Sequence, residues 1–284
     1  MQQDLKKIIA NVTGFMPVQL RPMGGGCVAD VREVIFENGK TIVAKIGDTG
    51  ANLELEGFML EYLRRSAALP VPEILYATDD LLLMSMVNTD GGLSGAAQKH
   101  AAELVAKLHS VTASQFGFER STVIGGLHQP NKVNKSWISF FRDQRLMNMA
   151  QQCLASGRLP TKLMRRIEML AGKLENWLED TASPSLIHGD MWGGNVLSYN
   201  GKISGFIDPA IYFADAEIEL AFITMFNTFS SDFFDRYAEF HEIRPGFFEE
   251  RIDLYNLYPL LVHVRLFGGS YISSIDKTLK KFGF

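Results

Sequence analysis

The residues of this sequence best suited to chemistry lie in the stretch LIHGDMWGGNVL, residues 186–197. Asp190 stands five residues before Asn195, and Asp208 follows 13 residues after Asn195. A carboxylate can orient and deprotonate a hydroxyl group, while an amide oxygen and a second carboxylate are hard ligands that suit Mg²⁺. The pattern H-x-D-x-x-x-x-N therefore indicates phosphate transfer, with Asp190 as the base and with Asn195 and Asp208 as magnesium ligands.

The same string also fits an ordinary polar turn between two strands, since so short a pattern arises by chance in some sequences. In the phosphate-transfer interpretation we expect His188 to brace the loop by hydrogen bonds rather than to titrate during turnover.

A second group of residues upstream favours the chemical interpretation. Gly24, Gly25 and Gly26 interrupt a strand-like region, Lys45 follows Gly26 by 19 residues near the end of a predicted strand, and Glu56 follows 11 residues later. Phosphate transfer from ATP needs a backbone cradle and a cation for the phosphates. Each of these features is common singly, but their order together with Asp190, Asn195 and Asp208 is that of protein kinases. The sequence therefore predicts a kinase-like fold that uses ATP and Mg²⁺.

The elements that must position these residues follow from the periodicity of the apolar side chains. Residues 1–87 are expected to form a small lobe with an antiparallel sheet of about five strands and one crossing helix. Glu56 is expected on the inward stripe of that helix. The predicted elements are a short opening helix over 5–12, a strand from 18, two strands over 28–46 joined by a hairpin turn at Asn38-Gly39, a helix over 51–68, and strands over 73–78 and 81–87.

The polar segment NTDGGLSG, residues 88–95, is the expected linker, and residues 88–284 are expected to form a mainly helical lobe with the catalytic loop and the substrate site. His109 is expected on the polar side of its helix, where it is solvated or caps the helix and is not catalytic. The fold class is thus α+β, a two-lobed protein-kinase-like fold. The predicted elements are helices over 97–108, 137–149, 163–178 and 218–225, and strands over 185–190, 195–200 and 202–208, the last two joined by a hairpin turn at Asn200-Gly201.

Composition limits the class of protein. The chain has 284 residues, of which 46% are hydrophobic, and a net charge of -4 with no long basic block, so it lacks the electrostatic pattern of a nucleic-acid binder. Its start does not resemble a secretory signal, and nowhere do 18 apolar residues run together. We expect a cytoplasmic protein, a monomer or weak dimer, with neither a nucleic-acid nor a membrane partner.

The chain has only two cysteines, Cys27 and Cys153, which suits a reducing compartment. Cys27 directly follows the three glycines and has two interpretations. It either packs as a small apolar residue under the loop, or it is a reactive thiol beside phosphate-binding amides that acts as a redox switch or cross-links two chains. Activity with and without reductant, in wild type and in Cys27→Ala, separates the two.

These motifs resemble those of the fructosamine kinases, which belong with aminoglycoside and choline kinases to the protein-kinase-like superfamily. HGDMWGGN is similar to that family's HGDLWSGN, and DPAIYFADAE at 208–217 resembles its DPA-x-Y-Y-G-x-x-E. The region 116–146 resembles the family's series FGF, IG, QPN, W, FF and RL, which aminoglycoside kinases lack. The resemblance runs from the glycine loop to about Leu220.

The resemblance implies ATP-dependent phosphorylation of the third-carbon hydroxyl of a ketosamine, the Amadori adduct of a sugar and an amine, free or on a protein lysine. The adduct then decomposes and releases the amine, which repairs glycation. The resemblance also implies that Asp190 is the base, that Asn195 and Asp208 hold Mg²⁺, and that Lys45 with Glu56 grips the phosphates. The implied adenine-contacting linker is Met84, Ser85, Met86 and Val87, and the implied substrate contacts are Trp192, Gln129, Asn131 and Glu217.

The chain departs from the family pattern at four positions. It has Gly193 for serine, Met191 for leucine, Ala214 for glycine and Glu219 for aspartate, and none of these changes removes an essential chemical group. Gly193 and Ala214 are expected near the substrate cleft, so they bear on which substrate is used.

Two further functions remain open. One is a kinase for another small hydroxyl compound, such as an aminoglycoside, choline or a free sugar, and the other is a nucleotide-binding pseudokinase that acts as a scaffold. A protein kinase is disfavoured, because only eight residues separate Asp208 from Glu217 and leave little room for a long activation segment with a phosphosite.

The aromatic residues beside these motifs also have two interpretations. Trp192 either stacks on a sugar or packs in the core, whereas Phe140 and Phe141 are expected in the core.

Overall fold

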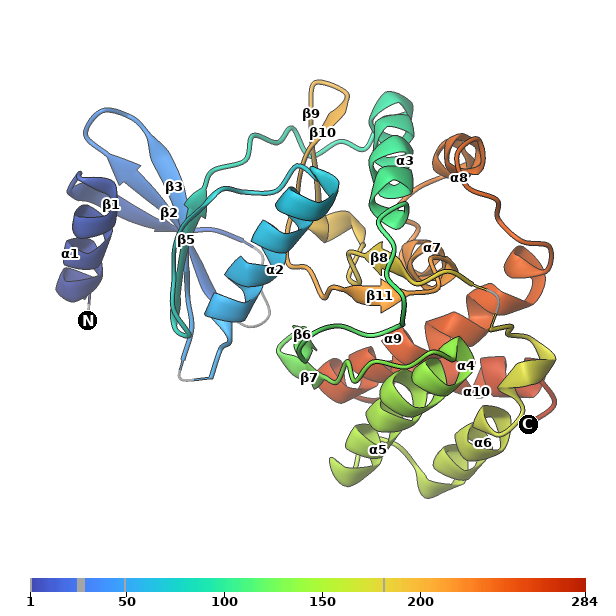
Figure 1. The fold of residues 1–284 in the computed structure, drawn as a ribbon. Coiled ribbons are helices and arrows are strands. Elements are labelled where there is room, and N and C mark those ends of the chain that lie inside the picture. The colour runs from blue at the N-terminus through green and yellow to red at the C-terminus, as the bar shows by residue number, and fades with distance from the viewer. Residues whose placement is uncertain (1, 25–28, 49, 181) are drawn as a thin grey trace. The chain divides into compact units, whose positions relative to one another are not determined.

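The computed structural model describes residues 2–24, 29–48, 50–180 and 182–284. They form two compact units (Figure 1). Unit 1 comprises residues 1–101 and 194–209, and unit 2 comprises residues 102–193 and 210–284. The lobe boundary after Val87 stays a prediction. Residues 194–209 pack with unit 1, although they come much later in the chain.

Unit 1 is built on an antiparallel sheet of five strands in the order β1-β2-β3-β5-β4, as the alternating patterns predicted. The turn between β2 and β3 is the expected hairpin, and Gly39 adopts a positive φ of 77° there, a conformation that costs glycine little. The strands are β1 (Pro17–Pro22), β2 (Asp30–Phe36), β3 (Thr41–Ile46), β4 (Ile74–Ala77) and β5 (Leu81–Ser85).

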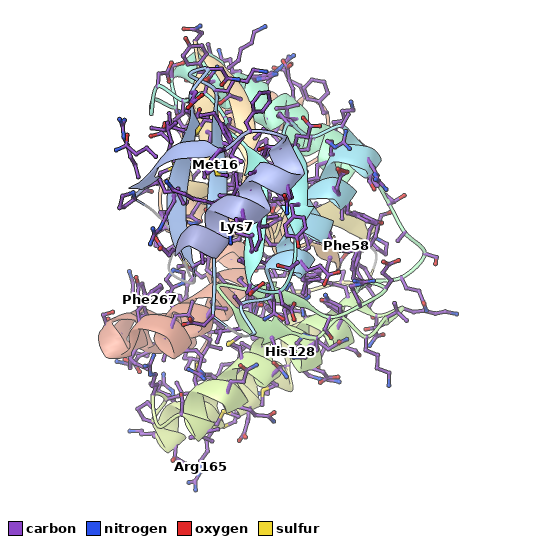
Figure 2. All side chains as sticks on the ribbon, turned by 90° about the vertical axis from the view of Figure 1, so that its left-hand side faces the viewer. Lys7, Met16, Phe58, His128, Arg165 and Phe267 are labelled. Carbon is purple, nitrogen blue, oxygen red and sulfur yellow. The ribbon has the colours of Figure 1, made fainter. Side chains whose placement is uncertain are left out.

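Two helices, α1 (Gln2–Thr13) and α2 (Leu53–Ala67), lie on opposite faces of this sheet (Figure 1). Successive side chains of a strand point to opposite faces, so β3 divides its residues between the two helices. Ile42 and Ala44 pack with Ile9 on the α1 side, which faces the viewer in Figure 2, whereas Val43 packs on the α2 side. The alternation places Lys45 on the same face as Val43, toward α2.

The hairpin of β9 (Val196–Tyr199) and β10 (Lys202–Phe206) completes unit 1. Its turn is Asn200-Gly201, as predicted, with φ values of 51° and 72° that are typical of a tight two-residue turn. The backbone N–H of Phe206 donates to the carbonyl of Pro70 at 2.8 Å, and that of Asn200 donates to Asp90 at 2.8 Å. These bonds explain why a segment so late in the sequence belongs to the first unit.

Unit 2 is mainly helical, as predicted, and packs around α9 (Ile252–Phe267), whose residues from Leu254 to Val262 are all buried. Trp137, Phe140 and Phe141 are fully buried, which confirms the core interpretation of the two phenylalanines. Two short antiparallel pairs accompany the helices: β6 (Thr122–Ile124) with β7 (Leu127–Gln129), and β8 (Ser185–Ile187) with β11 (Tyr212–Ala214).

The helical elements, in chain order, are α3 (Gly95–His109), which begins in unit 1, α4 (Trp137–Phe140), η1 (Phe141–Met147), α5 (Asn148–Ala155), α6 (Thr161–Ala171), η2 (Leu174–Asn176), η3 (Gly193–Asn195), α7 (Glu217–Met225), α8 (Ser231–Ala238), η4 (Phe247–Arg251), α9 (Ile252–Phe267), η5 (Gly269–Tyr271) and α10 (Ile272–Lys281). In the part of the chain that the structure describes, none of these helices is both long and apolar enough to cross a membrane.

The structure corrects two expectations. The helix predicted over 163–178 ends at Ala171, because Gly172 closes it and a short 3₁₀ turn, η2, follows. His109 is buried rather than solvated. The helix predicted over 137–149 is present but runs through a π-helical segment, η1.

Candidate active site

Lys45, Glu56 and Asp208 meet in unit 1. The ammonium group of Lys45 donates to Oε1 of Glu56 at 2.6 Å and also to Oδ1 of Asp208. Lys45 is only 7% exposed, whereas the Asp208 side chain is 34% exposed. The pairing of Lys45 with Glu56, expected from the stripe of α2, is therefore present, and Asp208 joins it from 163 residues away.

The electrostatics of this cluster are those of one cation shared by two acids. Burial by itself lowers the pKa of Lys45, but the attraction of Glu56 and Asp208 outweighs it and raises that pKa above its ordinary value. Burial raises the pKa of Glu56 to about 7, although the charge of Lys45 opposes the shift. Lys45 therefore stays charged at neutral pH.

Asn195 and Asp208 are brought together by the β9–β10 hairpin. Val196 pairs with Phe206 in the register, and the N–H of Ile207 donates to the carbonyl of Asn195 at 3.1 Å. Asp208 itself has a φ of 55°, a left-handed conformation that aspartate tolerates better than most residues and that redirects its side chain at the end of the strand.

The oxygen donors of this pair fit Mg²⁺ bound together with a nucleotide. Among the described residues, no three acidic, histidine or cysteine side chains converge as a metal site. Mg²⁺ commonly takes one or two protein oxygens and completes its shell with phosphate and water, which is the supply that Asn195 and Asp208 would provide.

The glycine loop joins β1 to β2, at the end of the sheet where Lys45 lies opposite Val31. The N–H of Met23 donates to the carbonyl of Val31 at 2.8 Å and closes the base of the loop. Gly24 is exposed, and a Cβ added to it would meet nothing within 4 Å. Gly25, Gly26 and Cys27 lie outside the described residues.

The predicted adenine-contacting linker starts in β5, which contains Met84 and Ser85, and continues beyond it with Met86 and Val87. Met84 pairs with Val43 in the sheet. The N–H of Ser85 donates to the carbonyl of Glu73 at 2.9 Å, and the N–H of Glu73 donates to the hydroxyl of Ser85 at 2.9 Å. Val87 packs closely on Gly205, where an added Cβ would come within 3.0 Å of the valine side chain. Within the described residues, no hydrogen bond is formed by the backbone of Met86 or Val87, so their polar groups are the ones available to a base.

Asp190 lies in unit 2, in the loop after β8. Gly189 has a φ of 84°, and a Cβ there would lie 2.2 Å from the carbonyl oxygen of Ala210, so glycine is required. The N–H of Asp190 donates to Nδ1 of His188 at 3.3 Å, and the N–H of Ala210 donates to the His188 carbonyl at 2.8 Å. The prediction that His188 braces the loop by hydrogen bonds is confirmed.

Glu219 holds the same loop from α7. Its carboxylate accepts the N–H of Gly189 at 2.7 Å, the N–H of His188 at 3.2 Å and Nε2–H of His109 at 3.0 Å. The hydroxyl of Tyr237 lies 2.8 Å from Nδ1 of His109. Burial alone would raise the pKa of Glu219, but the hydrogen bond and charge of His109 hold it below its ordinary value.

Sequence reasoning missed this holding role of Glu219, noting the residue only as a departure from the family. One signal was present: Glu217 and Glu219 are the only acids in the otherwise mostly apolar segment EIELAFITM, and an acid on a buried helix needs a partner.

The residues predicted to contact substrate through polar groups are buried, and each has protein partners. The amide of Gln129 bonds to Thr122, Ala210 and Tyr258, and that of Asn131 bonds to Arg120, Thr122 and Arg145. Glu217 accepts hydrogen bonds from Arg244 and Arg251. The structure therefore presents no exposed polar group at Gln129, Asn131 or Glu217.

Trp192 is 42% exposed, so core packing does not describe it. Met191 and Ala214 are buried, and a Cβ at Gly193 would meet nothing within 4 Å. Nothing in the structure explains why Gly193 replaces the family's serine.

Comparison with known proteins decides the family. The family model for fructosamine kinase matches residues 1–282. The chain belongs to the fructosamine kinase family. This membership confirms the resemblance read from HGDMWGGN and identifies the chain as a phosphotransferase with an alcohol group as acceptor.

Curated relatives of this family member carry related names. A "Probable ketoamine kinase" of Vibrio cholerae is 34% identical over 228 residues, which cover 78% of this chain and 77% of that one. Another from Vibrio parahaemolyticus is 31% identical over 234 residues, covering 80% and 79%. The "Protein-ribulosamine 3-kinase, chloroplastic" of Oryza sativa subsp. indica is 29% identical over 263 residues, covering 89% and 75%.

Solved structures confirm the protein-kinase-like fold of the family member. A crystal structure from Thermobifida fusca, proposed to be a fructosamine-3-kinase, matches with a TM-score of 0.87 and 27% identity over 97% of both chains. Aminoglycoside phosphotransferase APH(4)-Ia matches with a TM-score of 0.68 and 18% identity over 100% of both chains, a similarity of fold alone.

Proposed function

We propose that this fructosamine kinase family member transfers the γ-phosphoryl group of ATP, with Mg²⁺, to a sugar hydroxyl of a ketosamine, free or linked to a protein, and so takes part in the repair of glycation in the cytoplasm. The observation that carries the proposal is the cluster of Lys45, Glu56 and Asp208, which three distant segments of the chain bring together in unit 1. A buried lysine held by a helix glutamate beside a partly exposed aspartate is what a nucleoside triphosphate with its metal requires.

The roles within unit 1 follow from exposure and charge. Lys45 supplies a cation for the phosphates, Asp208 and Asn195 supply oxygens for Mg²⁺, and the glycine loop from Gly24 supplies backbone N–H groups. Of the four linker residues, Met86 and Val87 are proposed to bind the adenine edge, because the sheet already uses Met84 and Ser85.

The roles within unit 2 centre on Asp190 as the base for the acceptor hydroxyl. Gln129 and Asn131 are proposed to position the loop rather than to contact substrate, since Gln129 donates to the carbonyl of Ala210 at 3.0 Å and Ala210 in turn donates to His188. Glu217 is proposed to fix the start of α7 through its two arginines.

The test is phosphate transfer from ATP to a panel of fructosyl, ribulosyl and psicosyl amines, beside aminoglycosides and choline. Activity is expected on the ketosamines, and the Asp190→Asn variant, prepared identically, controls for contaminating kinases. Activity confined to the aminoglycosides or choline would overturn the substrate class. Nucleotide binding without transfer to any acceptor would make the chain a pseudokinase.

A further inference from the structure

A row of aromatic side chains in unit 2 starts at the catalytic loop and has no part in the roles above. The ring centroids of Trp192 and Phe226 are 6.0 Å apart, those of Phe226 and His263 are 5.1 Å apart, and His263 lies 4.9 Å from Tyr271 and 5.5 Å from Phe267. These separations are typical of interacting aromatic pairs. We call these five residues the aromatic ladder.

The outer side of the aromatic ladder is open to solvent. Phe226 is 37% exposed and Phe267, labelled in Figure 2 at the end of α9, is 53% exposed. The inner side is packed, since Phe226 meets the buried ring of Phe222 edge to face at 6.1 Å. A contiguous exposed aromatic surface on a globular domain marks a binding site more often than a single exposed apolar residue does.

The aromatic ladder is continuous with the reaction centre of the proposed function. Its first member, Trp192, is two residues beyond Asp190, and the N–H of Trp192 donates to the Asp190 carbonyl at 3.2 Å. Its central member is fixed, because Nδ1–H of His263 donates to the carbonyl of Pro259 at 2.7 Å.

The aromatic ladder also carries no formal charge at neutral pH. Burial lowers the pKa of His263 below its ordinary value, although the bond to Pro259 opposes the shift, so the imidazole is neutral. Trp192, Phe226 and Phe267 have no ionisable side chain.

We propose that the aromatic ladder is a subsite for the amine half of the ketosamine, and that it favours amines that carry an aromatic group. The inference rests on the proposed function. In a ketosamine the nitrogen is on the first carbon and the reacting hydroxyl on the third, so the amine substituent leaves the sugar close to the reacting centre. A sugar whose hydroxyl meets Asp190 would bring that nitrogen toward Trp192 and its substituent toward Phe226.

The chemistry of the two partners is complementary. The nitrogen of a ketosamine is a protonated secondary amine at neutral pH, and a cation is attracted to the face of an indole or phenyl ring. An aromatic substituent beyond it gains by stacking and by leaving water. No ladder member carries a charge that would have to be desolvated when the substituent binds.

The experiment compares the ketosamine of fructose and benzylamine with that of fructose and methylamine. Wild type is expected to show a higher kcat/KM for the benzylamine adduct, and Phe226→Ala should lower the ratio of the two values about tenfold, the worth of one lost ring contact and its burial. Phe267→Ala, at the end of the aromatic ladder, should lower it about twofold to threefold. The methylamine adduct should be turned over at nearly the wild-type rate by both variants.

The matched control is Phe248→Ala, which removes an exposed phenylalanine, 55% exposed against 53% for Phe267, that contacts Phe234 and Phe247 instead. Its ratio should equal that of wild type. Phe226→Leu keeps apolar volume but loses the ring, so a lowered ratio in that variant, with an unchanged melting temperature, would rule out misfolding as the cause.

The outcomes separate the two proposals. If wild type phosphorylates both adducts equally well, or if Phe248→Ala lowers the ratio as much as Phe226→Ala, the subsite is refuted while the ketosamine kinase stands. If neither adduct accepts phosphate from ATP, the proposed function fails, and the subsite fails with it.

Discussion

The charged clusters of the two units differ in how their acids are satisfied. In unit 1, Glu56 and the partly exposed Asp208 share one lysine, Lys45. In unit 2, the fully buried Glu219 is satisfied by two backbone N–H groups and by His109. The first cluster can exchange its partners for a ligand, whereas the second can release its partners only if the loop before Asp190 unfolds.

The difference matches the work proposed for each cluster. A nucleotide and Mg²⁺ bring both a cation for Asp208 and an anion for Lys45. If the ion pair between these residues opens when the ligands bind, each side chain therefore still has an opposite charge beside it. A general base instead needs a fixed position, and backbone bonds to Glu219 supply one. The following variants test this comparison, beginning with the largest expected effect.

Asp190→Ala should lower kcat by about 10² to 10⁴, the usual worth of a positioned general base, and should leave ATP affinity nearly unchanged. Single-turnover phosphate transfer and ATP binding by calorimetry measure the two quantities. Full turnover by the variant would show that Asp190 is not the base. The Glu219 cluster in unit 2 would then not serve to position a catalytic residue.

Lys45→Met should lower kcat/KM for ATP by about 10² to 10³, because one preorganised cation at a phosphate is lost. Lys40→Met, a change of the same type at an exposed lysine beside the β2–β3 turn, serves as the control and should be close to wild type. An equal effect of both variants would show that the net charge of the protein, and not the cluster of Lys45, Glu56 and Asp208, determines kcat/KM for ATP.

Glu219→Gln should destabilise the fold by about 1–3 kcal/mol, since an uncharged amide cannot accept all the hydrogen bonds of the buried carboxylate. Urea unfolding at pH 7 measures this. Glu103→Gln, which breaks only the surface pair with Arg236, should cost about 1 kcal/mol or less. A Glu219→Gln variant as stable as wild type would contradict the rigid character of the second cluster.

The pH dependence of the unfolding free energy, compared between wild type and Glu219→Gln, gives a further test of Glu219. The folded-state pKa of Glu219 is depressed, so its contribution is fully present above the unfolded value near 4.3 and is lost as pH falls through the folded value. The stability gap between wild type and Glu219→Gln should therefore be constant from pH 8 to about 5 and narrow below it. A gap that widens on acidification would reverse the assigned sign.

Gly193→Ser should be nearly neutral, with a change in unfolding free energy below about 0.5 kcal/mol. The reason is the open space at this position, where an added side chain meets nothing. Thermal unfolding and kcat on the best ketosamine check it. A large loss of thermal stability or of kcat would mean that the open space at Gly193 is needed for a ligand or for movement of the loop after Trp192.

Local features of the sequence were predicted well because their causes are local. Gly39 and Gly201 mark hairpin turns by their tolerance of positive φ, and the alternation through β3 placed Lys45 on the face of Glu56. The helix end at Ala171 was missed because apolar residues continue at helical spacing past Gly172.

The partners of buried polar groups were not predictable in the same way. His109 looked solvated on its own helix, yet Glu219 comes to it from 110 residues away and Tyr237 from 128 residues away. Gln129 looked like a substrate contact, yet Tyr258 occupies its carbonyl from 129 residues away. The spacing of residues along a chain does not predict such long-range hydrogen bonds.

The sequence by itself determined the types and the order of the chemical groups: a glycine loop, Lys45, Glu56, Asp190, Asn195 and Asp208. It also placed Lys45 in a strand and Glu56 in a helix, as the structure has them. Only the tertiary structure decided which of these charges share a partner, which amides are enclosed, and which rings line the exposed side of the catalytic loop. The reason is that side-chain type and local geometry are encoded residue by residue, whereas burial and pairing depend on segments that meet only after the chain has folded.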